Sequence, residues 1–248
     1  MNDKAIEALR ADRRALLEIT AGLRDGDWKE PSGCPGWTVQ DVVGHMGALY
    51  WVVVDPSALP DTAGQPTEQA QDVYVEARRS WSADRVRSDY EAVSERALDI
   101  LQTFDGQEVE VPLGDLGTYP MSLLPSAFAF DHYIHIRCDL FPPRGPLQTP
   151  VPASDELRLA PTLDWIAAAL PQQNPSVVAS LSGTVEIDVT GPGGRRIWLG
   201  SGSTAVVIRS DSESFVRWIT HRAAWEDLGV VASGEGADLE RVRQLRVF

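Results

Sequence analysis

The hydrophobic pattern of the chain changes across a proline-rich segment at residues 141–155, and this change constrains the fold more than any other feature. Before the segment, apolar residues recur every three or four positions, as in residues 3–24, which is typical of amphipathic helices. After it, residues 184–190 alternate apolar and polar side chains, which is the period of a β-strand. A chain of 248 residues is long enough for two domains. We therefore predict a helical domain over residues 1–145 and a smaller α+β domain over residues 146–248.

Four helices are predicted in the first domain, which is consistent with a bundle. They cover residues 3–24, 38–54, 67–103 and 120–140. Thr38 and Asp41 form a capping-box-like pair at the start of the second helix. The third is predicted as one long helix, because no Gly or Pro follows Pro66 in that stretch.

The second domain is predicted to combine helices with an antiparallel sheet, so the predicted fold class is α+β. The predicted strands are residues 184–190, 195–199 and 204–208, joined by Gly-rich turns. The predicted helices are residues 154–170, 212–221 and 237–245.

The charge balance argues against two classes of partner. The sequence contains 36 acidic and 22 basic residues, which gives a formal net charge of −14. A negative surface repels phosphate backbones and anionic lipids, so we expect neither a nucleic-acid nor a membrane partner. The N-terminus has no secretory pattern, so we expect a cytoplasmic protein whose two cysteines, Cys34 and Cys138, are thiols. Their number and spacing form no metal or redox motif.

The chain has only four histidines, and two of them lie in patterns that suit a metal site. His45 lies on the flank of an apolar helix stripe, where a side chain can line a cleft between helices. The alternative is a half-buried histidine bonded to a backbone carbonyl. Asp131 and His135 are four residues apart and project from one helix face. An ordinary polar face, or the pairs His132 with His135 and His135 with Asp139, fit that segment as well.

Together, His45, Asp131 and His135 offer two imidazoles and one carboxylate from two helices, and bundle cores commonly build metal sites in this way. Three protein ligands leave a coordination position free, which is typical of a catalytic metal and not of a structural one. The chain has no G-x-S-x-G, Walker A or G-x-G-x-x-G pattern that would indicate another chemistry. The sequence therefore favours a metal-dependent function.

Three segments resemble the mycothiol-dependent maleylpyruvate isomerase family. Residues 34–45, CPGWTVQDVVGH, resemble the motif that opens the family's second helix and ends on a metal ligand. Residues 131–135, DHYIH, fall where the family has an acidic residue, three others and a histidine. Residues 183–248 resemble the family's small C-terminal domain, with His221 and Arg222 at the family's Gly-Arg position.

The resemblance implies a DinB-like metal-binding bundle followed by a sterol-carrier-like domain. It implies zinc, or another divalent metal, held by His45, Asp131 and His135, with mycothiol, a thiol made by actinobacteria, as cofactor. Arg222 would be the catalytic and cofactor-binding arginine, which binds an anionic group of the substrate or of the thiol. The chain departs from the family at two positions: Asp131 stands where the characterised isomerase has glutamate, and His221 replaces a glycine.

A metal with an open position can hold a thiol as thiolate near neutral pH. Such a thiolate supports cis–trans isomerisation of a conjugated double bond, or S-transfer onto a small electrophilic substrate. The expected function is therefore a mycothiol-dependent isomerase or transferase. The alternative is a non-catalytic metal- or small-ligand-binding protein of the same fold. Asp41, one turn before His45, is expected either to orient that histidine or only to cap the helix.

Overall fold

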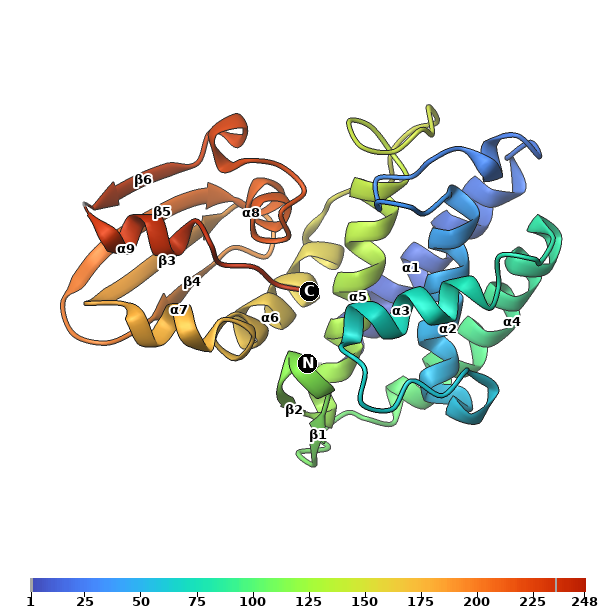
Figure 1. Cartoon of the computed structure of the whole chain (residues 1–248), viewed down its shortest axis with the longest axis horizontal. Helices are drawn as coiled ribbons and strands as arrows, with labels where there is room; N and C mark the ends of the chain where they lie inside the picture. Colours follow the sequence, from blue (N-terminus) through green and yellow to red (C-terminus); the bar gives the residue numbers. More distant parts are fainter. Residues whose placement is uncertain (1, 235) are drawn as a thin grey trace.

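The computed structural model describes residues 2–234 and 236–248, and Figure 1 shows a helical part beside a second part that contains the main sheet. In the helical part, four helices pack around one apolar core: α1 (Asn2–Ala21), α2 (Val39–Val54), α4 (Ala83–Gln102) and α5 (Leu124–Ile134). The short helix α3 (Thr67–Glu76) lies against α2. The predicted α+β class is confirmed. Among the described residues, no helix combines the length and the apolar character that crossing a membrane requires.

The start of α2 agrees with its prediction. The Thr38 hydroxyl accepts a hydrogen bond from the Asp41 amide at 3.2 Å, and the Asp41 carboxylate accepts one from the Thr38 amide at 2.9 Å. This capping box satisfies amide groups that have no partner within the helix. It also fixes the rotation of α2, and so the direction in which His45 points one turn later.

The prediction of a single helix over residues 67–103 is wrong, because the chain forms α3 and α4 with a break between them. The Ser82 side chain accepts a hydrogen bond from the Arg85 amide and caps a new helix. The Trp81 carbonyl accepts a hydrogen bond from the Gln40 side chain of α2. A serine cap and a tertiary contact therefore interrupt a stretch that contains no Gly or Pro.

The helix α5 begins after a short antiparallel hairpin, β1 (Glu110–Pro112) and β2 (Thr118–Pro120), and so starts later than predicted. It continues as a π-helical turn over His135–Asp139, in which the Leu140 amide donates to the His135 carbonyl. Turns of this kind often occur at functional sites.

The two parts of the molecule share α5. Ala129 belongs to the apolar core of the helical part, whereas Phe130, Tyr133 and Ile134 belong to a second core. This second core is completed by α6 (Glu156–Gln173) and by the main sheet. One helix therefore connects the interior of both parts.

The second part contains α6, α7 (Pro175–Ser180), the sheet, α8 (Ser212–Ile219) and α9 (Ala237–Val242). The strand order in the sheet is β4 (Arg195–Leu199), β3 (Thr184–Thr190), β5 (Thr204–Asp211) and β6 (Val231–Gly234). The predicted bounds of β3 and β4 are confirmed, β5 is longer than predicted, and β6 was not predicted.

The sheet contains the expected antiparallel pair of β3 with β4, and adds an antiparallel pair of β5 with β6 and a parallel pair of β3 with β5. The loop after β4 must cross the end of β3 to make this pairing. Gly183 and Gly200 allow the crossing: a Cβ on Gly200 would lie 2.6 Å from the Gly183 carbonyl oxygen, and one on Gly183 would lie 2.7 Å from the Ser203 carbonyl oxygen. Any larger residue at either position would clash with the backbone.

Candidate metal centre

The three side chains predicted as metal ligands come together between α2 and α5. Asp131 Oδ1 lies 3.1 Å from His45 Nε2 and 3.4 Å from His135 Nε2. All three donor atoms lie within 4.8 Å of one another. Donor atoms bound to one tetrahedral zinc at about 2.0–2.1 Å are about 3.3 Å apart, so the observed separations fit ligands of a single small cation.

The charge states of His45 and Asp131 also fit a divalent metal, whereas His135, whose pKa is raised by Asp131, Cys34 and Asp139, must lose a proton to bind one. Asp131 Oδ2 is buried and has no hydrogen-bond partner among the described residues, so its lone pairs are available to a cation. Burial lowers the pKa of His45, which favours the neutral imidazole. Burial opposes the ionisation of Asp131, but His135 and His45 hold the pKa of this carboxyl well below its usual range. Neutral imidazole and carboxylate are the forms that bind a divalent metal.

Asp41 caps α2 and does not contact His45. Its carboxylate accepts hydrogen bonds from the Thr38 amide and hydroxyl and lies 3.6 Å from Arg79. The capping interpretation of Asp41 is therefore the one that the structure bears out.

His132 makes its hydrogen bond elsewhere, although it follows Asp131 in the chain and its Nδ1 lies 3.7 Å from Asp131 Oδ2. Its side chain is fully buried, and its Nδ1–H donates to the Phe128 carbonyl at 3.0 Å. Its ring centroid lies 4.9 Å from that of Tyr50 and 6.0 Å from that of Tyr90. His132 thus packs inside the helical part, and it does not pair with a second histidine at the site.

The second ring nitrogen of His135 has a different partner. Its Nδ1–H donates to Asp139 Oδ2 at 2.9 Å, which leaves Nε2 facing Asp131 and His45. Both His135 and Asp139 belong to the π-helical turn. A carboxylate on the outer nitrogen of a ligating histidine fixes its tautomer and raises its basicity. Asp139 is therefore a support for His135 on the side away from the other candidate ligands.

Arg222 reaches this carboxylate from the second part of the molecule. Its Nε and Nη2 donate to Asp139 Oδ2 at 3.1 and 2.6 Å, and its side chain is 14% exposed. Burial opposes the ionisation of Asp139, but His135 and Arg222 hold the pKa of its carboxyl far below the usual range. The predicted contact of Arg222 with an anionic group of substrate or thiol stays a prediction.

His221 stands where the resembling sequences have a glycine, and its backbone conformation explains that preference. Its φ is 55°, in the left-handed region that favours glycine. Its Nε2–H donates to the Leu245 carbonyl at 3.0 Å, which helps to hold the histidine there. The turn that carries Arg222 is therefore preserved although the glycine is absent.

Two side chains that border the site, Trp37 and Cys34, were not identified from the sequence. The Trp37 ring centroid lies 5.0 Å from that of His45 and 6.3 Å from that of His135, and its indole N–H donates to Asp72. Cys34 Sγ lies 3.6 Å from His135 Nδ1. Both residues belong to the same motif as His45, and this shared motif is the signal that would have identified them.

Cys34, His135 and Asp139 form a second group of close donor atoms on the outer side of the imidazole. The carboxylate of this group already faces two guanidinium groups, those of Arg222 at 2.6 Å and Arg144 at 3.5 Å. Both would repel a cation placed there. The group of His45, Asp131 and His135 is therefore the better cation site, and Cys34 and Cys138 are free thiols as predicted.

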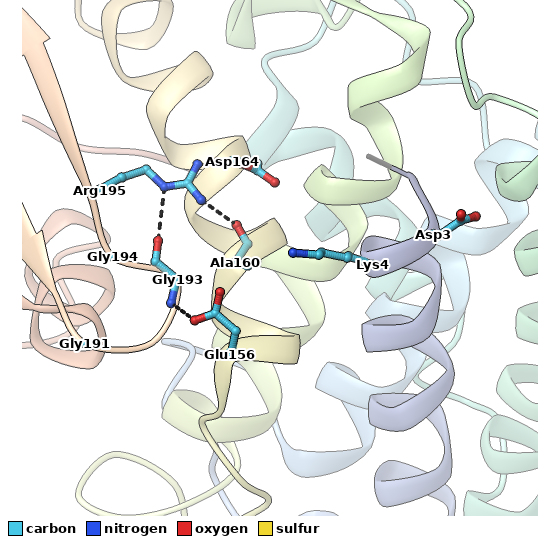
Figure 2. Close-up of a pocket in the computed structure, with 9 residues that line it drawn as sticks. All are labelled: Asp3, Lys4, Glu156, Ala160, Asp164, Gly191, Gly193, Gly194 and Arg195. Atoms are coloured by element: carbon cyan, nitrogen blue, oxygen red, sulfur yellow. Dashed lines mark hydrogen bonds and ion pairs between the residues drawn. The ribbon is translucent and has the colours of Figure 1, made fainter.

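A cavity of about 670 Å³ lies elsewhere, where the start of α1, α6 and the β3–β4 turn meet (Figure 2). Most of its charged groups have partners within the protein. Arg195 pairs with Asp164 at 2.5 Å, and the Glu156 carboxylate accepts the Gly193 amide. The cavity contains none of the candidate ligands, so it is a feature of the junction between the two parts and not of the site.

Comparisons with known proteins agree with the resemblance seen in the sequence. The family model of the mycothiol maleylpyruvate isomerase N-terminal domain matches residues 9–137. A crystal structure of mycothiol-dependent maleylpyruvate isomerase is similar with a TM-score of 0.60 and 18% identity, over 96% of this chain and 95% of that one. A histidine-to-alanine mutant of a protein of that name has a TM-score of 0.62 and 17% identity over the same shares. Identities this low establish a common fold alone, and no curated protein matches the chain.

Proposed function

Because the chain belongs to the mycothiol maleylpyruvate isomerase N-terminal domain family, we propose that it is a metal-dependent enzyme that uses mycothiol on a small electrophilic substrate. The proposed reaction is cis–trans isomerisation, of the kind named for maleylpyruvate isomerase, or S-transfer. One observation carries the proposal: the donor atoms of His45, Asp131 and His135 have the spacing of ligands of a single cation.

These three residues would hold zinc or another divalent ion and leave at least one coordination position free. When bound there, such an ion lowers the pKa of a thiol, so that a thiolate is available near neutral pH to add to a conjugated double bond or to attack an electrophile. Asp131 has a shorter side chain than glutamate, yet its Oδ1 lies within 3.4 Å of both histidine nitrogens. The substitution at this position is therefore compatible with the proposed ligand set.

Other residues of the chain would orient these groups and limit access of water. Asp139 accepts the Nδ1–H of His135, so Nε2 keeps its lone pair for the ion. Trp37 lies against both histidine rings and forms an apolar wall. Arg222 would attract an anionic group with its Nη1, which does not bind Asp139 and makes only a long hydrogen bond to the Thr220 carbonyl at 3.5 Å.

The test combines metal analysis with a thiol-dependent assay. The purified chain is loaded with zinc, its metal content is measured, and turnover is followed with mycothiol and either maleylpyruvate or a panel of small electrophiles. We expect about one metal ion per chain and turnover that requires both the ion and the thiol. Arg209→Gln on β5, which removes a largely exposed side chain, is the control and should keep both properties.

Two outcomes would contradict the proposal. A chain that takes up no metal at saturating zinc lacks the proposed centre. A chain that binds zinc but converts no substrate in the presence of mycothiol is a binding protein of the same fold and not an enzyme of this kind.

A further inference from the structure

Asp139 is a buried carboxylate that joins three segments of the chain. Its side chain has no exposed surface and accepts the Nδ1–H of His135 at 2.9 Å. From another direction it accepts a two-pronged contact from Arg222, and Arg144 Nε lies 3.5 Å away. Its backbone carbonyl accepts the Gly33 amide at 2.7 Å, which ties the loop before α2 to the same residue. A buried charge requires such a set of donors, so the carboxylate has little freedom to move.

Arg222 makes the position of this carboxylate depend on the second part of the molecule. It follows α8, and its backbone amide donates to the Arg217 carbonyl at 2.8 Å, so the residue is anchored before its side chain begins. Its guanidinium uses Nε and Nη2 on one carboxylate, a geometry that a single-point cation such as lysine lacks. Charge-assisted pairs of this kind are strong and fix direction as well as distance.

We propose that Arg222 and Asp139 form a positioning pair through which the second part of the molecule sets the orientation, and hence the metal affinity, of His135. The inference rests on the proposed metal centre. His135 has two ring nitrogens, and it serves the centre only when Nε2 faces Asp131. Asp139 selects that orientation by binding Nδ1–H, and Arg222 holds Asp139 in place.

The alternative role for the pair is purely structural, as an ion pair that holds the two parts together. The molecule has another such contact, in which Arg137 after α5 and Arg158 of α6 both bind the buried Asp12 of α1. A purely structural ion pair changes the free energy of unfolding but leaves the folded site unchanged. The metal affinity of the folded protein therefore separates the two roles.

The experiment measures zinc affinity by competition with a chelator, and the absorption spectrum of bound Co²⁺, in the full chain. We expect Asp139→Asn and Arg222→Gln to weaken zinc binding about 10- to 100-fold and to shift the Co²⁺ bands. Arg222→Lys should recover part of the loss, because it restores the charge but not the two-pronged contact. Arg209→Gln on β5, which removes a largely exposed side chain, is the control and should bind zinc as the wild type does.

Wild-type zinc affinity and an unchanged Co²⁺ spectrum in both variants, with only a lower thermal midpoint, would overturn the inference and leave the proposed metal centre intact. If the wild type itself binds no metal, the proposed function fails, and ¹⁵N NMR of His135 in the metal-free protein decides the remaining point. Chemical shifts of the His135 ring nitrogens and of Nδ1–H that are the same in Arg222→Gln as in the wild type would then overturn the positioning role. If Asp139→Asn does not fold, the zinc affinities and Co²⁺ spectra of Arg222→Gln and Arg222→Lys decide the question without it.

Discussion

The two parts of the molecule contribute to the candidate site in different ways. The helical part supplies all three proposed ligands, from α2, from α5 and from the π-helical turn that continues α5, and the family model covers most of this part. The second part contacts the site through Arg222, on the outer side of His135. On His135, the nitrogen Nε2 faces the other proposed ligands, and Nδ1 faces Asp139, which Arg222 contacts. Substitution of a proposed ligand in the helical part should therefore remove the metal, and substitution of Arg222 should only weaken the metal affinity.

Removal of a ligand is the strongest test of this difference. We expect His45→Ala and His135→Ala each to reduce bound zinc from about one ion per chain to almost none, because two ligands hold the ion poorly. Elemental analysis measures the metal, and circular dichroism should show an unchanged fold. His132→Gln is the control and should keep its metal, because His132 packs inside the helical part. Metal loss from the His132 variant together with retention in Asp131→Ala would mean that the ligand assignment is wrong.

Removal of the metal tests whether it serves the chemistry or the fold of the helical part. This part has its own apolar core, so a chelator should leave the circular dichroism spectrum nearly unchanged. An ion that binds only the native state raises the free energy of unfolding by about 2.7 kcal/mol when its free concentration is about one hundred times its dissociation constant. For a chain of this size, its loss should lower the thermal midpoint by about 5–10 °C. Unfolding of the helical part on chelation would make the metal structural.

The pH dependence of metal binding tests the charge of His135. Burial opposes its protonation, but Asp131, Cys34 and Asp139 raise the pKa of His135 well above its usual range. Below that pKa the metal must displace one proton, so zinc affinity should fall about tenfold for each unit of decreasing pH. His45 adds no proton, because burial lowers its pKa. Zinc titrations between about pH 6.5 and 8 measure the slope, and an affinity independent of pH would contradict the proposed role of His135.

The smallest expected effect concerns the turn that carries Arg222. His221 has a φ of 55°, which costs a residue with a side chain about 1 kcal/mol relative to glycine. His221→Ala loses the hydrogen bond to the Leu245 carbonyl and keeps this strain, whereas His221→Gly loses both. The free energy of unfolding, measured in urea, should therefore be about 1 kcal/mol higher for His221→Gly than for His221→Ala. Equal values would show that the turn carries no strain.

Features that depend on neighbouring residues could be predicted from the sequence. The capping pair of Thr38 and Asp41 marked the start of α2, the alternation of apolar residues marked β3, and the Gly-rich turn after β3 marked β4 as the returning strand. The spacing of Asp131 and His135 placed both on one helix face, and the structure brings that face to His45. These features follow from local geometry and capping chemistry.

Features that depend on contacts between distant segments could not be predicted. The break between α3 and α4 involves Gln40 of another helix, and the place of β5 beside β3 depends on a crossing loop that no periodicity records. β6 is exposed along its whole length, so it has no alternating pattern. Cys34 meets His135 only because the loop before α2 folds back onto the end of α5. The spacing of His135 and Asp139 allowed their contact, but the sequence could not choose it over the other pairs.

Because α5 contributes to both apolar cores, the two parts should unfold together. Cutting the chain after residue 145 would leave Phe130, Tyr133 and Ile134 of α5 exposed to water, at a cost of about 1.5–3 kcal/mol for each large side chain. We expect a single calorimetric transition for the whole chain and aggregation of the helical part when it is expressed alone. The proposed ligands on α5 and on the π-helical turn after it would then stay in place only as long as the entire molecule is folded. A destabilising change anywhere in the sheet would therefore reduce the fraction of molecules in which the proposed metal site is intact.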